Sequence, residues 1–184
     1  DYGAKLIDFA GFLMPIQYEG VSLEHNCVKK NVGVFDVSHM GQFIISGKKS
    51  DSFLQSVLSH DISILTPGQA QYNCLPNEIG GIVDDLILYK LDIDKYMLVV
   101  NASNIQKNLV FLNNRNNNIV NIDDLSDEYS LISVQGPNSS NVLEKLFKLE
   151  LVNLKYYCFI NHKDLIISNT GYTGCGGYEI YCKN

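Results

Sequence analysis

Hydrophobic and polar positions along this 184-residue chain alternate with a period of two in many short runs. Side chains of a strand point to opposite faces in turn, so this period is typical of strands with one buried face. The pattern predicts strands over residues 42–46, 70–75, 82–91, 96–101, 119–122, 128–134, 156–161, 164–168 and 178–182.

Helical spacing of apolar side chains predicts helices over residues 21–31, 50–58, 104–112 and 138–147. Ser22 and Ser103 are the expected N-caps of the first and third of these helices, because a serine hydroxyl accepts hydrogen bonds from first-turn amides. Residues 4–18 are rich in apolar side chains without either period. We expect packed irregular structure there.

Three of the predicted strands follow one another closely, joined by residues 76–81 and by the polar turn 92–95. Short polar connections of this kind favour antiparallel hairpins. The chain has no repeated strand–helix–strand units. We therefore predict an α+β fold with antiparallel sheets and flanking helices.

Two adjacent acids, Asp84 and Asp85, lie inside the apolar strand predicted over residues 82–91. A charged side chain is costly to bury, so each acid must be solvated, paired or used in chemistry. Strand geometry places Asp85 on one face with Ile87 and Tyr89, and Asp84 on the other face. One interpretation is a pocket wall containing Asp85 and an aromatic ring. The other is that both acids lie at the strand entrance and remain hydrated.

Composition excludes several classes of protein. Hydrophobic residues make up 46% and charged residues 18% of the chain, which is typical of a globular protein. The net charge of −6 argues against a nucleic-acid partner, which requires a basic face. Arg115 is the sole arginine, so bound anions would be met by lysines or backbone amides.

Five cysteines occur without a CxxC spacing, so we expect no zinc or other metal site and free thiols in a reducing compartment. No apolar run approaches the length of a membrane span, and no signal sequence opens the chain. We expect no membrane association. The chain starts with Asp1 and stops after a strand-like run, so we expect both ends to be cut.

Several segments, in this order and spacing, resemble the aminomethyltransferase, or T-protein, family of the glycine cleavage system. They cover residues 3–11 (GAKLIDFAG), 14–15 (MP), 33–41 (GVFDVSHMG), 80–86 (GGIVDDL), 99–104 (VVNASN), 135–137 (QGP) and 171–179 (GYTGCGGYE). The family is roughly twice the length of this chain. The resemblance therefore identifies the chain with the N-terminal half.

The resemblance implies a three-lobed ring around a folate cavity. Residues 1–41 with 128–184 would form an incomplete first folate-binding lobe, residues 42–127 the second, and the third would be absent. The implied activity releases ammonia from the aminomethyl-lipoyl arm of the H-protein and forms methylenetetrahydrofolate from tetrahydrofolate. The implied partners are thus lipoylated H-protein and folate, in a bacterial cytoplasm rather than a mitochondrial matrix. We expect this chain to be inactive by itself.

The family's catalytic aspartate falls on Asp85, which the strand argument also places beside Tyr89. The resemblance implies folate-lining roles for further residues, namely Met40, Tyr72, Tyr89, Val99, Asn101, Tyr172 and Glu179. The family's glycine-rich motif has two acids where this chain has Cys175 and Gly176. Two carboxylates of the family motif are therefore missing from the expected edge of the pocket, whereas Glu179 is retained at the pterin-binding position that the resemblance implies.

Three alternative interpretations stay open. One is a T-protein-like folate-binding protein of iron-sulfur cluster maintenance, which would typically lack the paired Asp84 and Asp85. Another is the folate half of a sarcosine or dimethylglycine dehydrogenase. The third is an inactive binding or structural remnant.

Overall fold

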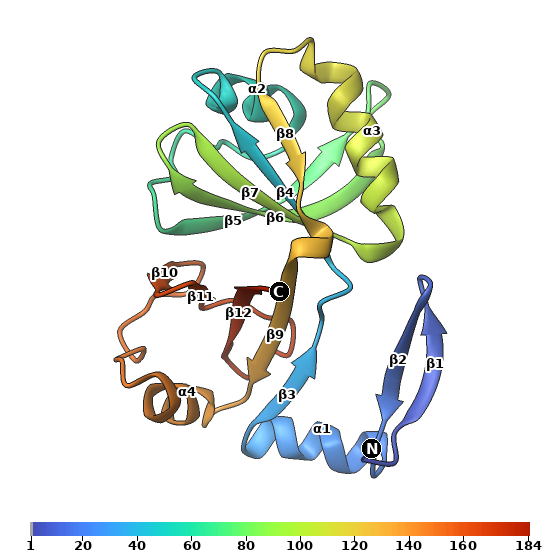
Figure 1. The fold of residues 1–184 in the computed structure, drawn as a ribbon, viewed down its shortest axis with the longest axis vertical. Helices are drawn as coiled ribbons and strands as arrows, with labels where there is room; N and C mark the ends of the chain where they lie inside the picture. The colour runs from blue at the N-terminus through green and yellow to red at the C-terminus, as the bar shows by residue number, and fades with distance from the viewer. Residues whose placement is uncertain (1) are drawn as a thin grey trace. The chain divides into compact units, whose positions relative to one another are not determined.

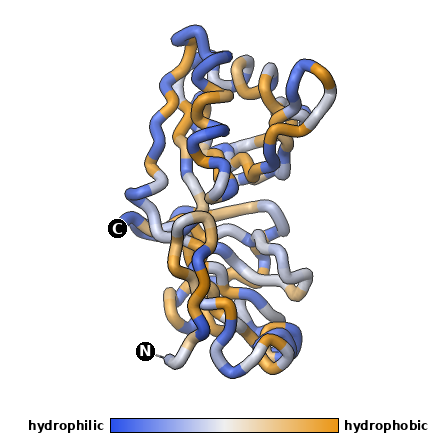
Figure 2. The backbone as a smooth tube through the Cα atoms, turned by 90° about the vertical axis from the view of Figure 1, so that its right-hand side faces the viewer, coloured by the Kyte–Doolittle hydropathy of each residue, from blue (hydrophilic) through white to orange (hydrophobic). Residues whose placement is uncertain are grey.

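A computed structural model describes residues 2–184, and these divide into two compact units. The first unit comprises the described residues up to Val37 together with Ser130–Cys182. The second comprises Ser38–Tyr129 with Lys183–Asn184. Each unit has a sheet and its own hydrophobic cluster, and Figure 2 shows hydrophobic positions recurring through both parts of the tube.

The second unit is built on a five-stranded sheet with the order β5-β6-β7-β4-β8. Its strands are β4 (Gly41–Ser46), β5 (Gln69–Pro76), β6 (Ile82–Asp92), β7 (Lys95–Val100) and β8 (Asn121–Asp124). All four neighbouring pairs are antiparallel, which confirms the two predicted hairpins β5-β6 and β6-β7. The predicted α+β class with antiparallel sheets is confirmed in this unit.

Two helices, α2 (Ser50–Val57) and α3 (Ile105–Asn116), cover one face of this sheet (Figure 1). Phe53 of α2 and Leu112 of α3 pack into one cluster with Leu88 and Leu98 of the central strands. Each fully buried side chain of this size contributes about 1.5–3 kcal/mol to folding. The cluster therefore holds α3 firmly against β6, which places the side chains discussed below.

The first unit contains a five-stranded sheet with the order β10-β11-β12-β9-β3. Its strands are β3 (Gly33–Asp36), β9 (Tyr129–Gln135), β10 (Phe159–His162), β11 (Leu165–Ser168) and β12 (Gly177–Lys183). Helix α4 (Ser139–Phe147) contributes Leu143 to a core with Val134, Leu151, Ile167 and Ile180. Strand β3 was not predicted, because four residues carry too little periodicity to be recognised.

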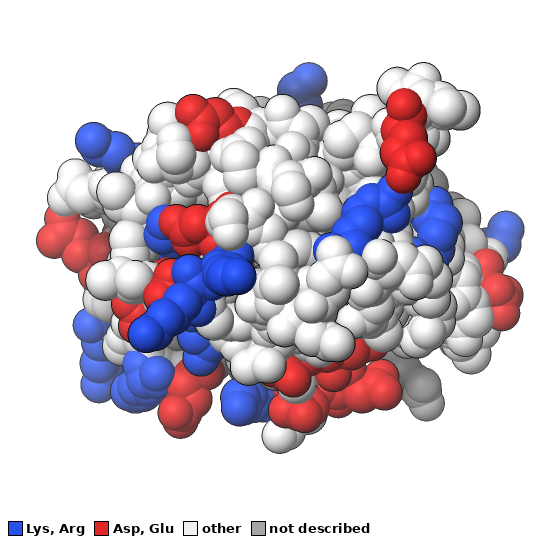
Figure 3. All heavy atoms as spheres, turned by 90° about the horizontal axis from the view of Figure 1, so that it is seen from above, with Lys and Arg blue, Asp and Glu red and all other residues white. Residues whose placement is uncertain are grey.

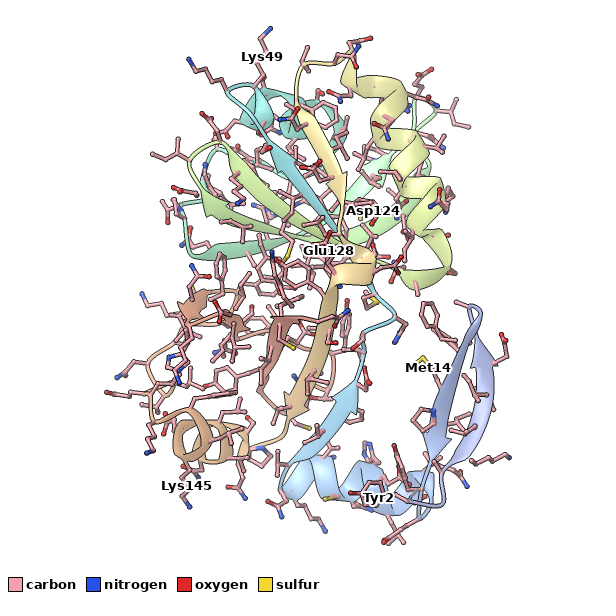
Figure 4. The ribbon with its side chains drawn as sticks, in the orientation of Figure 1. Tyr2, Met14, Lys49, Asp124, Glu128 and Lys145 are labelled. Carbon is pink, nitrogen blue, oxygen red and sulfur yellow. The ribbon has the colours of Figure 1, made fainter. Side chains whose placement is uncertain are left out.

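The expectation of irregular structure over residues 4–18 is wrong. This segment forms a hairpin of β1 (Lys5–Phe9) and β2 (Phe12–Gln17), turning at Ala10 and Gly11, which both have positive φ. Both faces of the hairpin carry apolar side chains, so the period-two alternation that marks a strand is missing. Figure 4 shows Met14 extending from β2, and no side chain of either strand is fully buried.

The predicted serine caps are also wrong. Helix α1 (Val21–Lys30) begins after Gly20, and α3 begins after Asn104, with no side-chain cap at either start. At α1 the Glu24 carboxylate instead accepts hydrogen bonds from the backbone amides of Tyr18 and Gly20.

Within residues 2–184, the structure contains no helix with the length and apolar character needed to cross a bilayer.

Candidate functional site

Asp84 and Asp85 lie on opposite faces of β6, as the strand pattern predicts. In the register of β5 and β6, Asp85 pairs with Cys74 and Asp84 pairs with Leu75. Leu75 belongs to the core under α2 and α3, so Asp84 is on the helix-covered face. Asp85 is on the other face with Tyr89, which confirms that these two side chains share a face.

Asp85 is half-buried and is held by hydrogen bonds to both carboxylate oxygens. The hydroxyl of Tyr72 donates to Oδ2 at 3.0 Å. The side-chain amide of Asn101 donates to Oδ1 at 3.0 Å and to the backbone carbonyl of Asp85 at 3.2 Å. Two residues that the sequence analysis assigned to the site, Tyr72 and Asn101, therefore both contact the third, Asp85, within the second unit.

The phenol of Tyr72 remains a hydrogen-bond donor at neutral pH. Its hydrogen bond to Asp85 raises the pKa of Tyr72 to about 12, with smaller contributions from burial and from the Asp85 charge. The ring itself is 47% exposed. Tyr72 can therefore both fix the Asp85 carboxylate and offer an aromatic surface to a ligand.

Asp84 is buried, with 8% of its surface exposed, and accepts hydrogen bonds from asparagine amides at both oxygens. Asn101 and Asn104 donate to Oδ1 at 3.0 and 2.9 Å, and Asn108 donates to Oδ2 at short range. Hydrogen bonds to a charged acceptor are stronger than neutral ones and offset the desolvation of the buried acid. The sequence analysis did not find this role for Asp84 or Asn108.

A sequence signal for this arrangement does exist. Asn104 and Asn108 are four residues apart at the start of a predicted helix, a spacing that places both side chains on one side of it, and Asn101 lies just before them. Asn108 is fully buried, and among the described residues its Oδ1 has no hydrogen-bond partner. An orphaned buried polar group costs about 1–3 kcal/mol. A buried asparagine at this position therefore indicates that its amide hydrogens are needed by Asp84.

Three further candidates of the second unit lie on the same sheet or beside it. Tyr89 and Val99 are buried and point to the same sheet face as Asp85, since Val99 pairs with Ile87. Met40 directly precedes β4, is half-buried, and accepts a hydrogen bond at its carbonyl from the Gln42 side chain at 2.8 Å. Their positions fit a surface around Asp85.

The remaining two candidates, Tyr172 and Glu179, belong to the first unit. Glu179 is buried on β12, and burial raises the pKa of its carboxyl group, while a hydrogen bond from the Thr170 hydroxyl opposes this shift. Tyr172 lies in the loop before β12 and is 74% exposed.

The loop before β12 is wrapped around the side chain of Gln135. The Gln135 amide donates to the carbonyl of Thr170 at 3.1 Å and accepts from the Thr173 hydroxyl at 3.0 Å. Gly171 has φ +154°, and a Cβ there would lie 2.1 Å from Gln135 Oε1, so only glycine fits. A cavity of about 260 Å³ opens here, lined by Gln135, Tyr156, Thr170, Gly171, Gly174, Gly176 and Gly177.

Cys175 makes its contacts inside this loop. Its backbone amide donates to the Thr173 hydroxyl at 3.3 Å, and its thiol lies 3.5 Å from the Thr173 carbonyl. Cys175, which replaces an acid of the family motif, therefore takes part in a turn whose hydrogen bonds stay within the loop.

On the face seen in Figure 3, basic and acidic side chains both occur, and neither sign covers the face as a whole. Among residues 2–184, no group of three or more His, Cys, Asp or Glu side chains is arranged to hold a metal ion. The polar cluster at Asp84 and Asp85 is thus the main chemical feature of the second unit.

Comparison with known proteins gives a consistent result. A family model described as "GCVT N-terminal domain" matches residues 1–184. Curated relatives named aminomethyltransferase include one from Flavobacterium psychrophilum, 51% identical over 99% of this chain and 52% of the relative. Others are from Bacteroides fragilis (47% identical, 97% of this chain, 51% of the relative) and Bacillus subtilis (44%, 100% and 52%). The chain spans about half the length of the curated relatives it matches.

Solved structures show the same relationship. The glycine cleavage system aminomethyltransferase T from Bartonella henselae superposes with a TM-score of 0.91 at 36% identity, covering 98% of this chain and 50% of that chain. A heterotetrameric sarcosine oxidase from Corynebacterium sp. U-96, in complex with pyrrole 2-carboxylate, has a TM-score of 0.61 at 15% identity, covering 88% and 82%. The second similarity concerns the fold alone.

Proposed function

The chain belongs to the GCVT N-terminal domain family, and from this membership we propose that it forms part of a tetrahydrofolate-dependent aminomethyltransferase of the glycine cleavage system. The reaction takes the aminomethyl group from the lipoyl arm of the H-protein. It releases ammonia and transfers the carbon to tetrahydrofolate, which becomes methylenetetrahydrofolate. Tetrahydrofolate is a co-substrate here, and the lipoyl group arrives with the partner protein.

The observation that carries this proposal is the fixed carboxylate of Asp85. Transfer of a carbon from an amine to a folate nitrogen builds positive charge at that carbon. At about 4 Å and an effective dielectric near 20, a carboxylate attracts a unit positive charge by about 4 kcal/mol before desolvation is subtracted. The hydrogen bonds from Tyr72 and Asn101 hold the Asp85 oxygens in place beforehand, so little reorganisation is needed.

The other candidates of the second unit would supply a surface for the folate. The half-exposed ring of Tyr72 fits stacking or edge contact with a planar pterin. Met40, Tyr89, Val99 and Asn101 would line the same side of the site. In the first unit, the buried carboxyl group of Glu179 could accept hydrogen bonds from the amino and ring NH groups of a pterin. The exposed side chain of Tyr172 would line the folate.

Two rival functions have less support. A folate-binding protein of iron-sulfur cluster maintenance would not require Asp84 and Asp85 together, and the curated relatives reported above are named aminomethyltransferase. The folate half of a sarcosine or dimethylglycine dehydrogenase is supported by a fold similarity at 15% identity. The curated relatives named aminomethyltransferase come from bacteria, which supports the expected bacterial setting.

We expect that the 184-residue chain does not turn over by itself. Several apolar side chains of the β1-β2 hairpin are half-exposed or more, including Phe9 at 51% and Leu13 at 71%. An isolated two-stranded hairpin with such surfaces is marginally stable in water. Turnover by the isolated chain at a rate near that of the full-length protein would contradict this expectation.

The test uses the full-length protein that contains this chain. Purified protein is mixed with aminomethylated H-protein, and ammonia release is measured with and without tetrahydrofolate. We expect release that depends on tetrahydrofolate and is accompanied by formation of methylenetetrahydrofolate. Release of ammonia at an equal rate without the folate, or no release at all, would refute the proposed function.

A further inference from the structure

We propose that Asp84 is a positioning residue, whose buried carboxylate fixes the amide of Asn101 and thereby the orientation of the Asp85 carboxylate. This inference rests on the proposed function for its meaning in catalysis. Its structural content rests on the contacts of the second unit and can be tested separately.

The first step is the anchoring of Asp84 itself. An ionised carboxylate only accepts hydrogen bonds, so the NH₂ group of each neighbouring asparagine must face it. Asn104, at the start of α3, donates to Oδ1 of Asp84, and Asn108, within α3, donates to Oδ2. Among the described residues Asp84 makes no ion pair, so amide hydrogens stabilise its charge.

The second step is the bridge. The Asn101 amide nitrogen lies 3.0 Å from Asp84 Oδ1, 3.0 Å from Asp85 Oδ1 and 3.2 Å from the Asp85 carbonyl. An amide nitrogen has two hydrogens, so these three acceptors share them. Asp84 thus decides which way the Asn101 amide points, and the second hydrogen of that amide defines where Asp85 Oδ1 must lie.

The third step links the bridge to the exposed side of the sheet. Asp84 and Asp85 are adjacent on β6 and point to opposite faces, so they do not contact each other through their own side chains. Asn101 directly follows β7, beside the acid-bearing end of β6, and reaches both residues there. The packing of α3 against the sheet is thereby connected to the geometry of the proposed catalytic acid.

The decisive measurement is the pKa of Tyr72, which depends on how the Asp85 carboxylate is oriented. Full-length protein is labelled with ¹³Cζ-tyrosine, Tyr72→Phe identifies the Tyr72 resonance, and the phenol is titrated by NMR between about pH 7 and pH 11. In the wild-type protein the hydrogen bond to Asp85 raises the pKa of Tyr72 to about 12, so we expect the phenol to stay largely protonated over this range. In Asp84→Asn we expect the midpoint to fall by at least about one pH unit toward the ordinary value near 10.

Kinetics provides the second readout. Asp84→Asn is expected to lower kcat about tenfold while the KM for tetrahydrofolate changes by less than about threefold, because an interaction that acts in the transition state is weakened. Asn108→Ala also loosens Asp84, and it removes an unsatisfied oxygen at the same time. Asn108→Ala removes one of three donors to Asp84, whereas Asp84→Asn turns an NH₂ group toward those donors. We therefore expect Asn108→Ala to lose some stability but to fold even if Asp84→Asn does not, and to shift the Tyr72 midpoint in the same direction.

The matched control is Asn116→Ala. Asn116 is a buried asparagine at the other end of α3, where its side chain makes three hydrogen bonds to the backbone of residues 119 and 120. Its loss should lower stability and leave both the Tyr72 titration and kcat unchanged.

The outcomes separate the two claims. An unchanged Tyr72 titration in folded Asp84→Asn or Asn108→Ala overturns the positioning role, and so does an equal shift in Asn116→Ala. A Tyr72 shift confined to the Asp84 and Asn108 variants supports it. If that shift occurs but the wild-type protein releases no ammonia, the positioning role holds and the proposed function fails.

Discussion

The hydroxyl of Tyr72 on β5 lies 3.0 Å from Oδ2 of Asp85 on β6, although the two residues are not directly paired in the sheet. Tyr72 pairs with Ile87, and its ring extends diagonally along the sheet face to the acid. The contact fixes one oxygen of Asp85 and leaves the ring half-exposed. Asp84 is buried and Asp85 is half-buried, so Asp85 is the more accessible of the two acids.

We expect Asp85→Asn to lower ammonia release from aminomethylated H-protein by at least about a hundredfold in the full-length protein, the scale for loss of a positioned charged group. The amide keeps the size of the side chain but removes its negative charge. The assay is the initial rate of ammonia release at saturating folate. Asp84→Asn should cost less, about tenfold, since Asp84 acts through Asn101. Equal losses from the two variants, with both proteins folded, would refute the assignment.

Glu179→Gln is expected to weaken tetrahydrofolate binding by about 1–3 kcal/mol. A carboxylate accepts hydrogen bonds at two oxygens, whereas the glutamine amide has only one oxygen and presents an NH₂ donor in place of the other. Calorimetric titration of the full-length protein measures the change. The control is Cys175→Ser, which should bind almost as the wild type, since the thiol contacts its own loop. A larger loss in Cys175→Ser than in Glu179→Gln would mean that the loop, and not Glu179, recognises the folate.

Glu179 should also leave a signature in the pH dependence of stability. Burial raises the pKa of Glu179 above its ordinary value of 4.5, so the folded state holds this proton more tightly than the unfolded state. The free energy of unfolding therefore falls as pH rises from about 4.5 to the raised pKa, and this contribution is constant above it. Glu179→Gln lacks this part of the fall. Urea titrations of both proteins at several pH values test it, and parallel profiles would contradict it.

Gly136→Ala is expected to destabilise the protein by about 2–4 kcal/mol. Gly136 has φ +125°, and a Cβ there would lie 2.4 Å from the Asn31 carbonyl oxygen and 2.6 Å from that of Val28. Denaturant unfolding measures the loss. The control is Gly80→Ala, which has φ +81° but no atom within 4 Å of the added Cβ. Backbone strain alone should cost this control about 1 kcal/mol, and equal losses would show that the close approach at Gly136 is unimportant.

Much of the second unit follows from local pattern. The apolar run around Asp84 and Asp85 gives a strand, and its period of two puts the acids on opposite faces regardless of what surrounds them. The polar turn before Lys95 predicts the hairpin that the structure contains. The β1-β2 hairpin escaped prediction because both of its faces are apolar, so its sequence has no alternation to read.

The sequence by itself determined the antiparallel α+β class, the opposed faces of Asp84 and Asp85, and the family to which the chain belongs. Tertiary structure decided which side chains complete the site. The contact of Tyr72 with Asp85 depends on the register between two strands, and the contacts of Asn104 and Asn108 with Asp84 depend on how α3 packs on the sheet. Local periodicity specifies the face on which a residue lies, whereas its partner across the fold is set by packing between segments distant in the chain.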